Sequence, residues 1–101
     1  MINLDMIGRV QKNAIEVYGT GTAEGFNEIL RPAFDRSGFD IKRTPSGVGP
    51  SDHSVFHRAG LPVLHFFSGS HPDYHQPSDT FEKVNYEDGV RLVALIADVA
   101  Q

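Results

Sequence analysis

Apolar and polar positions change their period several times along the chain. Residues 2–7 (INLDMI) form a short apolar run broken by two polar residues, which predicts a strand. Residues 14–19 (AIEVYG) alternate apolar with polar side chains and predict a second, half-buried strand. Residues 39–44 predict a modest third strand. Residues 61–67 (LPVLHFF) are the most apolar run, which predicts a central, buried strand.

The segment from Thr22 to about Ser37 has a helical period. Its apolar residues at helical spacing are Phe26, Ile29, Leu30, Ala33 and Phe34. Gly38 is a natural stop for this helix. Pro32 lies inside the run and predicts a kink, or a division into two short helices.

Two further helices are predicted in the second half of the chain. Ser51 can cap a short helix that continues through Arg58 and ends at Gly60. Asn85, with Asp88 three residues later, predicts the cap of the last helix. The apolar stripe predicted for that helix comprises Val90, Val93, Ala94, Ile96, Ala97 and Ala100. Strands that alternate with helices indicate a layered α/β fold.

Composition and charge narrow the function classes. A length of 101 residues predicts one domain, residues 1–101, with a single core. The net charge is −4 and the nine basic residues are scattered, which argues against a nucleic-acid partner. The absence of cysteine excludes disulfides, thiolate nucleophiles and sulfur-ligated zinc. The opening MINLDMIGRV enters a strand at once, without a signal peptide, and suggests a chain cut from something longer.

Two motifs resemble known sites only superficially. YGTGTAEG follows a predicted strand, but its Gly-x-Gly-x-x-x-Gly spacing is longer than a dinucleotide fingerprint, so a turn before a helix is favoured. SDHS, residues 51–54, holds Ser, Asp and His in succession. Adjacent helical residues point in different directions, so these three cannot form a hydrolase triad. Whether Asp52 and His53 face a site as supporting residues stays open.

The loop GSHPDYHQPSDT, residues 69–80, is dense in polar chemistry. His71 and His75 are four apart, but Pro72 and Pro77 argue against a helical pair of metal ligands. The loop follows the most buried strand, and sites of α/β proteins gather at strand ends. Two alternatives stay open: a solvated surface loop, or a neutral imidazole metal ligand with neighbouring carboxylates.

Asp5 is unusual because it interrupts an apolar strand. A buried carboxylate is costly unless it is paired or bound to a metal. The alternative is that Asp5 lies at the end of the strand and accepts backbone hydrogen bonds. The residues alone favour neither.

Three motifs together resemble the C-terminal portion of the M28-type zinc-dependent aminopeptidases. They are NLDMIGR, GPSDHSVFHRAGLPVLHFFSG and HPDYHQPSDTFEKVN, which occur in this order and cover nearly the whole chain. The resemblance implies the fold of that family, an α/β sandwich in which a layered, mixed β-sheet has flanking helices on both faces. Residues 1–101 would be the C-terminal part of such a catalytic domain.

The resemblance also implies a site with two zinc ions bridged by a carboxylate and a water or hydroxide. Asp5 matches a carboxylate ligand of one zinc, and His75 matches a histidine ligand of the other. Tyr74 matches a tyrosine that hydrogen-bonds the oxyanion of the tetrahedral intermediate in some members. Supporting roles are expected for Ser51, Asp52, His53, His71 and Asp79.

The family site needs three further ligands and a glutamate general base. These belong to a His-x-Asp pair and a Glu-Glu pair that precede the NLDM strand in the family, and neither His53 nor Glu24 matches them. We therefore expect a fragment of a metallopeptidase that hydrolyses N-terminal residues from peptides through metal-activated water. Alone, it should bind zinc weakly or not at all and be inactive.

Alternatives remain at this stage. The chain could be a fragment of a glutaminyl-cyclase-like enzyme with one zinc, or a non-catalytic binding module of the same fold. The expected partner is a peptide substrate of the parent enzyme, which we expect to be secreted, periplasmic or membrane-associated. An exposed sheet edge and apolar patch predict self-association of the fragment, or loosened order near residues 1–13.

Overall fold

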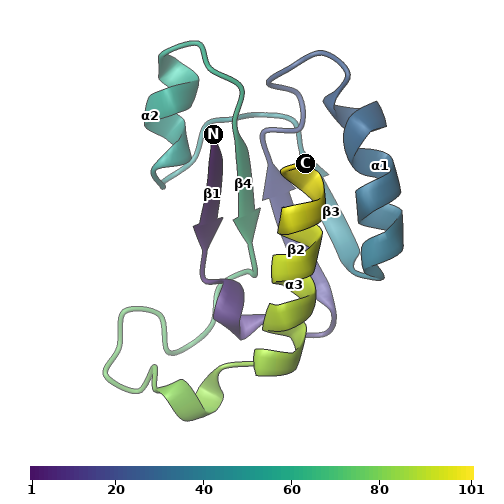
Figure 1. Ribbon diagram of the computed structural model, residues 1–101. Helices are drawn as coiled ribbons and strands as arrows, with labels where there is room; N and C mark the ends of the chain where they lie inside the picture. Colours follow the sequence, from purple (N-terminus) through teal and green to yellow (C-terminus); the bar gives the residue numbers. More distant parts are fainter.

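The computed structural model describes residues 1–101 as four strands, three α-helices and two short 3-10 helices (Figure 1). In chain order these are β1 (Ile2–Asp5), η1 (Ile7–Arg9), β2 (Ala14–Tyr18), α1 (Phe26–Ser37), β3 (Asp40–Thr44), α2 (His53–Arg58), β4 (Leu64–Phe67), η2 (Phe81–Lys83) and α3 (Tyr86–Val99). None of the helices has the length and hydropathy that a bilayer-spanning segment requires.

The four strands form one mixed sheet in the order β1-β4-β2-β3. β1 runs parallel to β4 and β2 runs parallel to β3, whereas β2 and β4 are antiparallel. The expected central, buried strand is therefore confirmed as β4, and the layered α/β fold with a mixed sheet is confirmed with it. That residues 1–101 make up a single domain stays a prediction.

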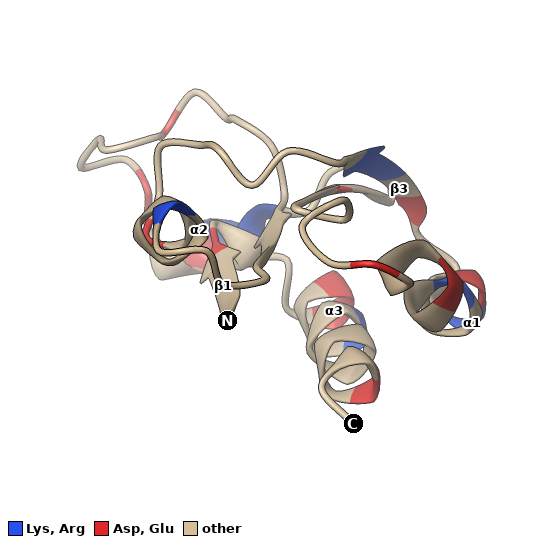
Figure 2. Ribbon diagram, turned by 90° about the horizontal axis from the view of Figure 1, so that it is seen from above, with Lys and Arg blue, Asp and Glu red and all other residues tan.

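The two faces of the sheet differ in character. Alternate side chains of a strand point to opposite faces, so Leu64 and Phe66 of β4 enter the core while His65 and Phe67 point away from it. α1 and α3 lie together on one side of the sheet (Figure 2). This core face buries residues from both helices and from the strands: Val10, Ile15, Val17, Leu30, Ala33, Phe34, Phe39, Leu64, Phe66, Leu92 and Leu95. The opposite, polar face carries Asn3, Asp5, Glu16, Tyr18, His65 and Phe67.

The first helix is shorter than its apolar period predicted. α1 begins at Phe26 rather than Thr22 because Gly25 adopts a left-handed backbone conformation (φ 80°) just before it. The Thr22 hydroxyl instead accepts the backbone N–H of Val63 at 3.0 Å, which joins this turn to the chain entering β4. The predicted division at Pro32 is wrong, since α1 continues through it to its expected stop at Gly38.

The last helix has apolar residues on two sides. Its predicted cap is confirmed, because the Asn85 side chain accepts the backbone N–H of Asp88 at 3.1 Å. The predicted apolar stripe is largely wrong as a core face: Val90 and Val93 are 71% and 55% exposed. The residues of α3 that pack into or against the core are Leu92, Leu95, Ile96 and Val99.

Candidate functional site

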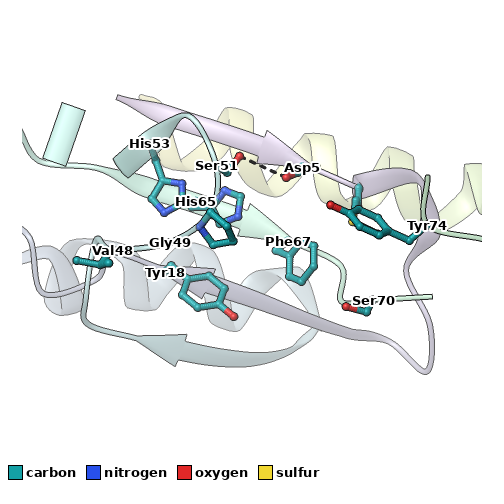
Figure 3. Close-up of a pocket in the computed structure, with 12 residues that line it drawn as sticks. Asp5, Tyr18, Val48, Gly49, Ser51, His53, His65, Phe67, Ser70 and Tyr74 are labelled. Carbon is teal, nitrogen blue, oxygen red and sulfur yellow. Dashed lines mark hydrogen bonds between the residues drawn. The ribbon is translucent and has the colours of Figure 1, made fainter. Parts of the chain in front are cut away.

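A cavity of about 350 Å³ opens on the polar face of the sheet (Figure 3). Strands β1, β2 and β4 contribute to its lining, as do the segment before α2 and the loop after β4. Its lining residues with polar side-chain atoms include Asp5, Tyr18, Ser51, His53, His65 and Tyr74. Val48, Phe67 and the glycine between Val48 and Pro50 complete much of the wall.

Asp5 is the last residue of β1, so the expected strand over residues 2–7 ends early. The chain turns directly after it because Met6 adopts a left-handed conformation (φ 57°). The half-buried carboxylate accepts a hydrogen bond from the Ser51 hydroxyl at 3.3 Å. Asp5 therefore lies at the strand's end, as one alternative held, but its hydrogen-bond partner is a side chain rather than the backbone. The Asp5 residue lines the cavity, and the Ser51 hydroxyl is its side-chain hydrogen-bond partner.

Ser51 does not cap α2 through its side chain, which corrects the sequence-based expectation. α2 begins at His53, and no side-chain hydrogen bond caps it. The Ser51 hydroxyl instead joins two residues of β1, since it accepts from Asn3 Nδ2 at 2.8 Å and donates to Asp5. Asp52 lies exposed at the start of α2 and does not line the cavity.

His53 and His65 form a stacked pair in the wall of the cavity. Their ring centroids are 4.2 Å apart and their planes differ by 10°. His53 is fully buried, and neither of its ring nitrogens has a protein partner. Burial is the main cause that lowers the pKa of both residues, and the second cause is a neighbouring imidazole: His57 for His53, and His53 for His65. The pair therefore lines the cavity as neutral imidazoles.

Sequence reasoning missed His65 and Tyr18 as site residues. Both occupy strand positions that alternate with core residues. The histidine inside the apolar run LPVLHFF was the one sequence signal that could have indicated a site residue there. Tyr18 lies 5.6 Å from His65 between ring centroids. Its pKa is raised, first by burial and then by the neighbouring Glu16 carboxylate.

The loop after β4 supplies the other side of the cavity. Tyr74 lines it and is 51% exposed, and its ring lies 3.9 Å from that of His75 between centroids. His75 is exposed, adopts a left-handed conformation (φ 54°), and stands beside the lining rather than in it. His71 is buried, and its Nδ1 has no protein partner.

The carboxylates of this loop form no hydrogen bond or ion pair with His75. Asp79 instead accepts a hydrogen bond from Arg9 at 2.7 Å. Asp73 accepts from Ser78, Arg9 and Lys83, and these hydrogen bonds, the one from Ser78 foremost, hold its pKa well below the usual range. Both carboxylates are therefore held by neighbouring side chains and not by the imidazole.

The donor types fit zinc in part. The Asp5 carboxylate and the His75 imidazole are oxygen and nitrogen ligands that zinc takes in proteins. No group of three or more His, Asp or Glu side chains in the structure is arranged to hold a metal ion. Because catalytic zinc sites use three protein ligands, these residues can contribute to a zinc site but do not complete one.

Comparison with known proteins decides the family. The profile of Peptidase family M28 matches residues 1–100. The chain belongs to peptidase family M28. This confirms the resemblance drawn from the three sequence motifs.

The relatives of this M28 chain are aminopeptidases. It is 36% identical over 95 residues to aminopeptidase YwaD of Bacillus subtilis (strain 168), covering 84% of this chain and 20% of YwaD. The crystal structure of BSAP, a zinc aminopeptidase from Bacillus subtilis, matches with a TM-score of 0.77 and 29% identity over 98% of this chain. Legionella pneumophila LapA aminopeptidase shares the fold, with a TM-score of 0.77 and 20% identity.

The M28 chain spans only part of these proteins. It covers 20% of the length of YwaD, 26% of BSAP and 29% of LapA. None of the three is described as a glutaminyl cyclase, so no observation favours that alternative.

Proposed function

We propose that this chain supplies one part of the active site of a zinc aminopeptidase that hydrolyses N-terminal residues from peptides. The observation that carries the proposal is the shared cavity on the polar face. Asp5 and Tyr74 are far apart in sequence, yet both line it, and the Ser51 hydroxyl holds the carboxylate of Asp5. Family membership and aminopeptidase relatives support the same function.

Asp5 and His75 are the residues that would hold zinc, one for each of two ions in the complete enzyme. When bound, zinc would polarise a carbonyl as a Lewis acid. It would also lower the pKa of a bound water to about 7, which supplies a hydroxide nucleophile at neutral pH. Ser51 orients the Asp5 carboxylate by hydrogen bonding, and such outer partners typically tune metal affinity.

Tyr74 is the proposed oxyanion donor. Its ring is half exposed and lines the cavity, so its hydroxyl is available to donate to the oxygen on which negative charge develops. The stacked His53 and His65 form an adjoining wall of the cavity, and burial favours their neutral form. Asp52, His71 and Asp79 keep the supporting roles expected from their motifs, as hypotheses.

The chain alone should not turn over a substrate. None of its residues matches the general-base glutamate, and no three of its His, Asp or Glu side chains converge on a metal position. We expect weak zinc binding that depends on His75, and no zinc-dependent release of an N-terminal residue. Calorimetric zinc titration of the chain and its His75→Ala variant, with a peptidase assay, tests both expectations.

Self-association is a further part of the proposal. β1 pairs only with β4, so its other edge is free, and Ile2 and Leu4 on this strand are 37% and 44% exposed. A free edge with exposed apolar side chains favours association between copies.

A chimera tests the catalytic assignment directly. The 101 residues replace the matching segment of YwaD, and zinc-dependent release of an N-terminal residue is measured. The chimera should be active. Asp5→Ala and His75→Ala should abolish activity, and Tyr74→Phe should lower kcat by about 10² to 10³ while leaving zinc binding intact.

Phe67→Leu in the chimera is a matched control, since Phe67 lines the same cavity but has no polar atom. A folded, zinc-loaded chimera without activity would contradict the proposal. So would full activity in the Asp5→Ala or His75→Ala variant.

A further inference from the structure

One arginine joins the segment after Asp5 to the loop of His75. Arg9 ends η1, directly after the turn that closes β1. Its guanidinium donates from Nη2 to Asp73 Oδ2 at 2.8 Å and from Nη1 to Asp79 Oδ1 at 2.7 Å. The two carboxylates stand on either side of His75 in the sequence. A single side chain therefore brackets the residue expected to bind zinc.

The Arg9–Asp73 ion pair is less exposed than the other arginine pairs of the molecule, whereas Asp79, at the second arm, is 43% exposed. The side chains of Arg9 and Asp73 are 14% and 15% exposed, whereas those of Arg36 and Asp98 are 63% and 37% exposed. The planar guanidinium holds its two carboxylates in a fixed fork, which a lysine ammonium cannot reproduce. Asp73 also accepts from the Ser78 hydroxyl at 2.6 Å, within the loop itself. The Arg9–Asp73 ion pair therefore restricts where the loop backbone can lie relative to η1.

Two side chains of the loop, Tyr74 and His75, have no hydrogen bonds of their own to the protein. Neither the Tyr74 hydroxyl nor the His75 ring takes part in any intramolecular hydrogen bond, and both residues are exposed. The backbone between them is held by local turns, among them the hydrogen bond from Gln76 N–H to the Asp73 carbonyl at 2.9 Å. The placement of both rings therefore depends on how the loop backbone is anchored, and Arg9 is its central anchor.

We propose that Arg9 is a positioning residue that sets where His75 and Tyr74 stand relative to Asp5. Arg9 lies four residues after Asp5 in the chain. Its two ion pairs therefore tie the loop that carries His75 to the segment that follows Asp5. The inference rests on the proposed function in one respect, the role of His75 as a zinc ligand. The anchoring itself is a property of the folded chain and is measured without metal.

Amide hydrogen exchange in the 101-residue chain tests the anchoring. Arg9→Met should speed exchange at the Gln76 and Asp79 amides several-fold, while the sheet amides of Val17 and Phe66 keep their protection. Arg9→Lys should give an intermediate rate, because lysine keeps one ion pair and loses the fork. Arg36→Met is the matched control, since it removes an arginine ion pair between α1 and α3 and should leave the loop unchanged.

Zinc titration, followed by NMR at the His75 imidazole, tests the consequence for the ligand. Arg9→Met should raise the zinc concentration for half-saturation about tenfold, the lower end of the effect of outer-shell partners. Removal of a positive charge would by itself strengthen binding of a cation. A weakening therefore separates positioning from charge.

Unchanged loop exchange in Arg9→Met, or exchange that rises equally in loop and sheet, would overturn the inference. If Arg9→Met does not fold, Asp79→Ala removes one arm of the fork and should speed loop exchange to a smaller extent. Wild-type chain without zinc binding at His75 would contradict the proposed function, while the exchange data would still decide the role of Arg9.

Discussion

The two faces of the same four-stranded sheet serve different purposes. On the core face, Phe66 and Val17 are fully buried among apolar side chains of α1 and α3. On the polar face, His65 and Tyr18, the immediate sequence neighbours of Phe66 and Val17, line a cavity. The fully buried side chain with unpartnered polar atoms, His53, also lies on this polar side. Alternate residues of the same strand therefore have different roles. Those on the core face stabilise the fold, and those on the polar face shape the cavity.

The difference teaches how the site can be shaped independently of the core. Because neighbouring strand residues point to opposite faces, a substitution at His65 or Phe67 leaves the packing of Leu64 and Phe66 in place. The polar face tolerates an open cavity because α1 and α3 cover only the other side (Figure 2). Each of the following predictions tests this division of labour.

Phe66→Ala should give the largest effect. Its side chain is fully buried at the centre of the core face, so its loss should cost about 3–5 kcal/mol of unfolding free energy. Urea denaturation measures the loss, and Phe67→Ala is the matched control. Phe67 is half-buried on the polar face, so its truncation should cost clearly less. Equal costs would show that the two faces are not energetically distinct.

Acidification should destabilise the polar face. Burial lowers the pKa of His53 and His65 in the folded chain, so the unfolded chain takes up protons first. Stability should be fully present above about pH 6.5 and fall below it, toward the lowered folded pKa values. Asp5, Asp52 and Glu16 oppose the shifts, and the imidazoles of His53 and His57 reinforce them.

Thermal unfolding of wild type and His53→Gln between pH 5 and pH 7.5 checks this dependence. The variant should show a smaller difference between the two pH values, whatever its absolute stability. An unchanged difference would mean that the stacked pair does not cause the acid sensitivity.

Much of the fold, and part of the candidate site, could be predicted from the sequence. The half-buried period of residues 14–19, the apolar run at 61–67 and the Asn85 cap all describe local patterns that the structure keeps. The motif resemblance predicted the family, which is confirmed. Assignment of Asp5, Tyr74 and His75 as site residues stays a prediction, although the structure places Asp5 and Tyr74 in one cavity.

The misses arose where tertiary contacts override local pattern. Ser51 satisfies every rule for a helix cap, but its hydroxyl binds Asn3 and Asp5 of a distant strand. The stripe containing Val90 and Val93 has a helical period, yet a second stripe on α3 packs into the core. The spacing of residues in the sequence predicts neither the partner of the Ser51 hydroxyl nor the side of α3 that faces the core. Both depend on which element packs against the segment.

Ser51→Ala should produce a moderate effect confined to the polar face. It removes the hydrogen bond to Asp5 and one of the two side-chain partners of Asn3 Nδ2, the other being His65 Nδ1 at 3.1 Å. Stability should therefore fall by about 0.5–1.5 kcal/mol. In the YwaD chimera, zinc affinity should fall about 10- to 100-fold. Ser70→Ala is the control, because Ser70 lines the same cavity without a hydrogen bond to Asp5. Equal effects of the two variants would remove Ser51 from the proposed site.

Val93→Ser should give the smallest change in stability and still alter association. Val93 lies on the outer side of α3, 55% exposed, in a groove shared with Ile7, Val84, Tyr86 and Val90. Exposed substitutions of this kind change unfolding free energy by about 0.5 kcal/mol or less. If copies of the chain associate through this groove, the variant should sediment at lower mass at the same concentration. Leu92→Ser, one residue away and fully buried, should instead unfold the chain. A monomeric wild type would contradict self-association altogether. An unchanged sedimentation profile of Val93→Ser in an associating chain would leave the free edge of β1 as the contact.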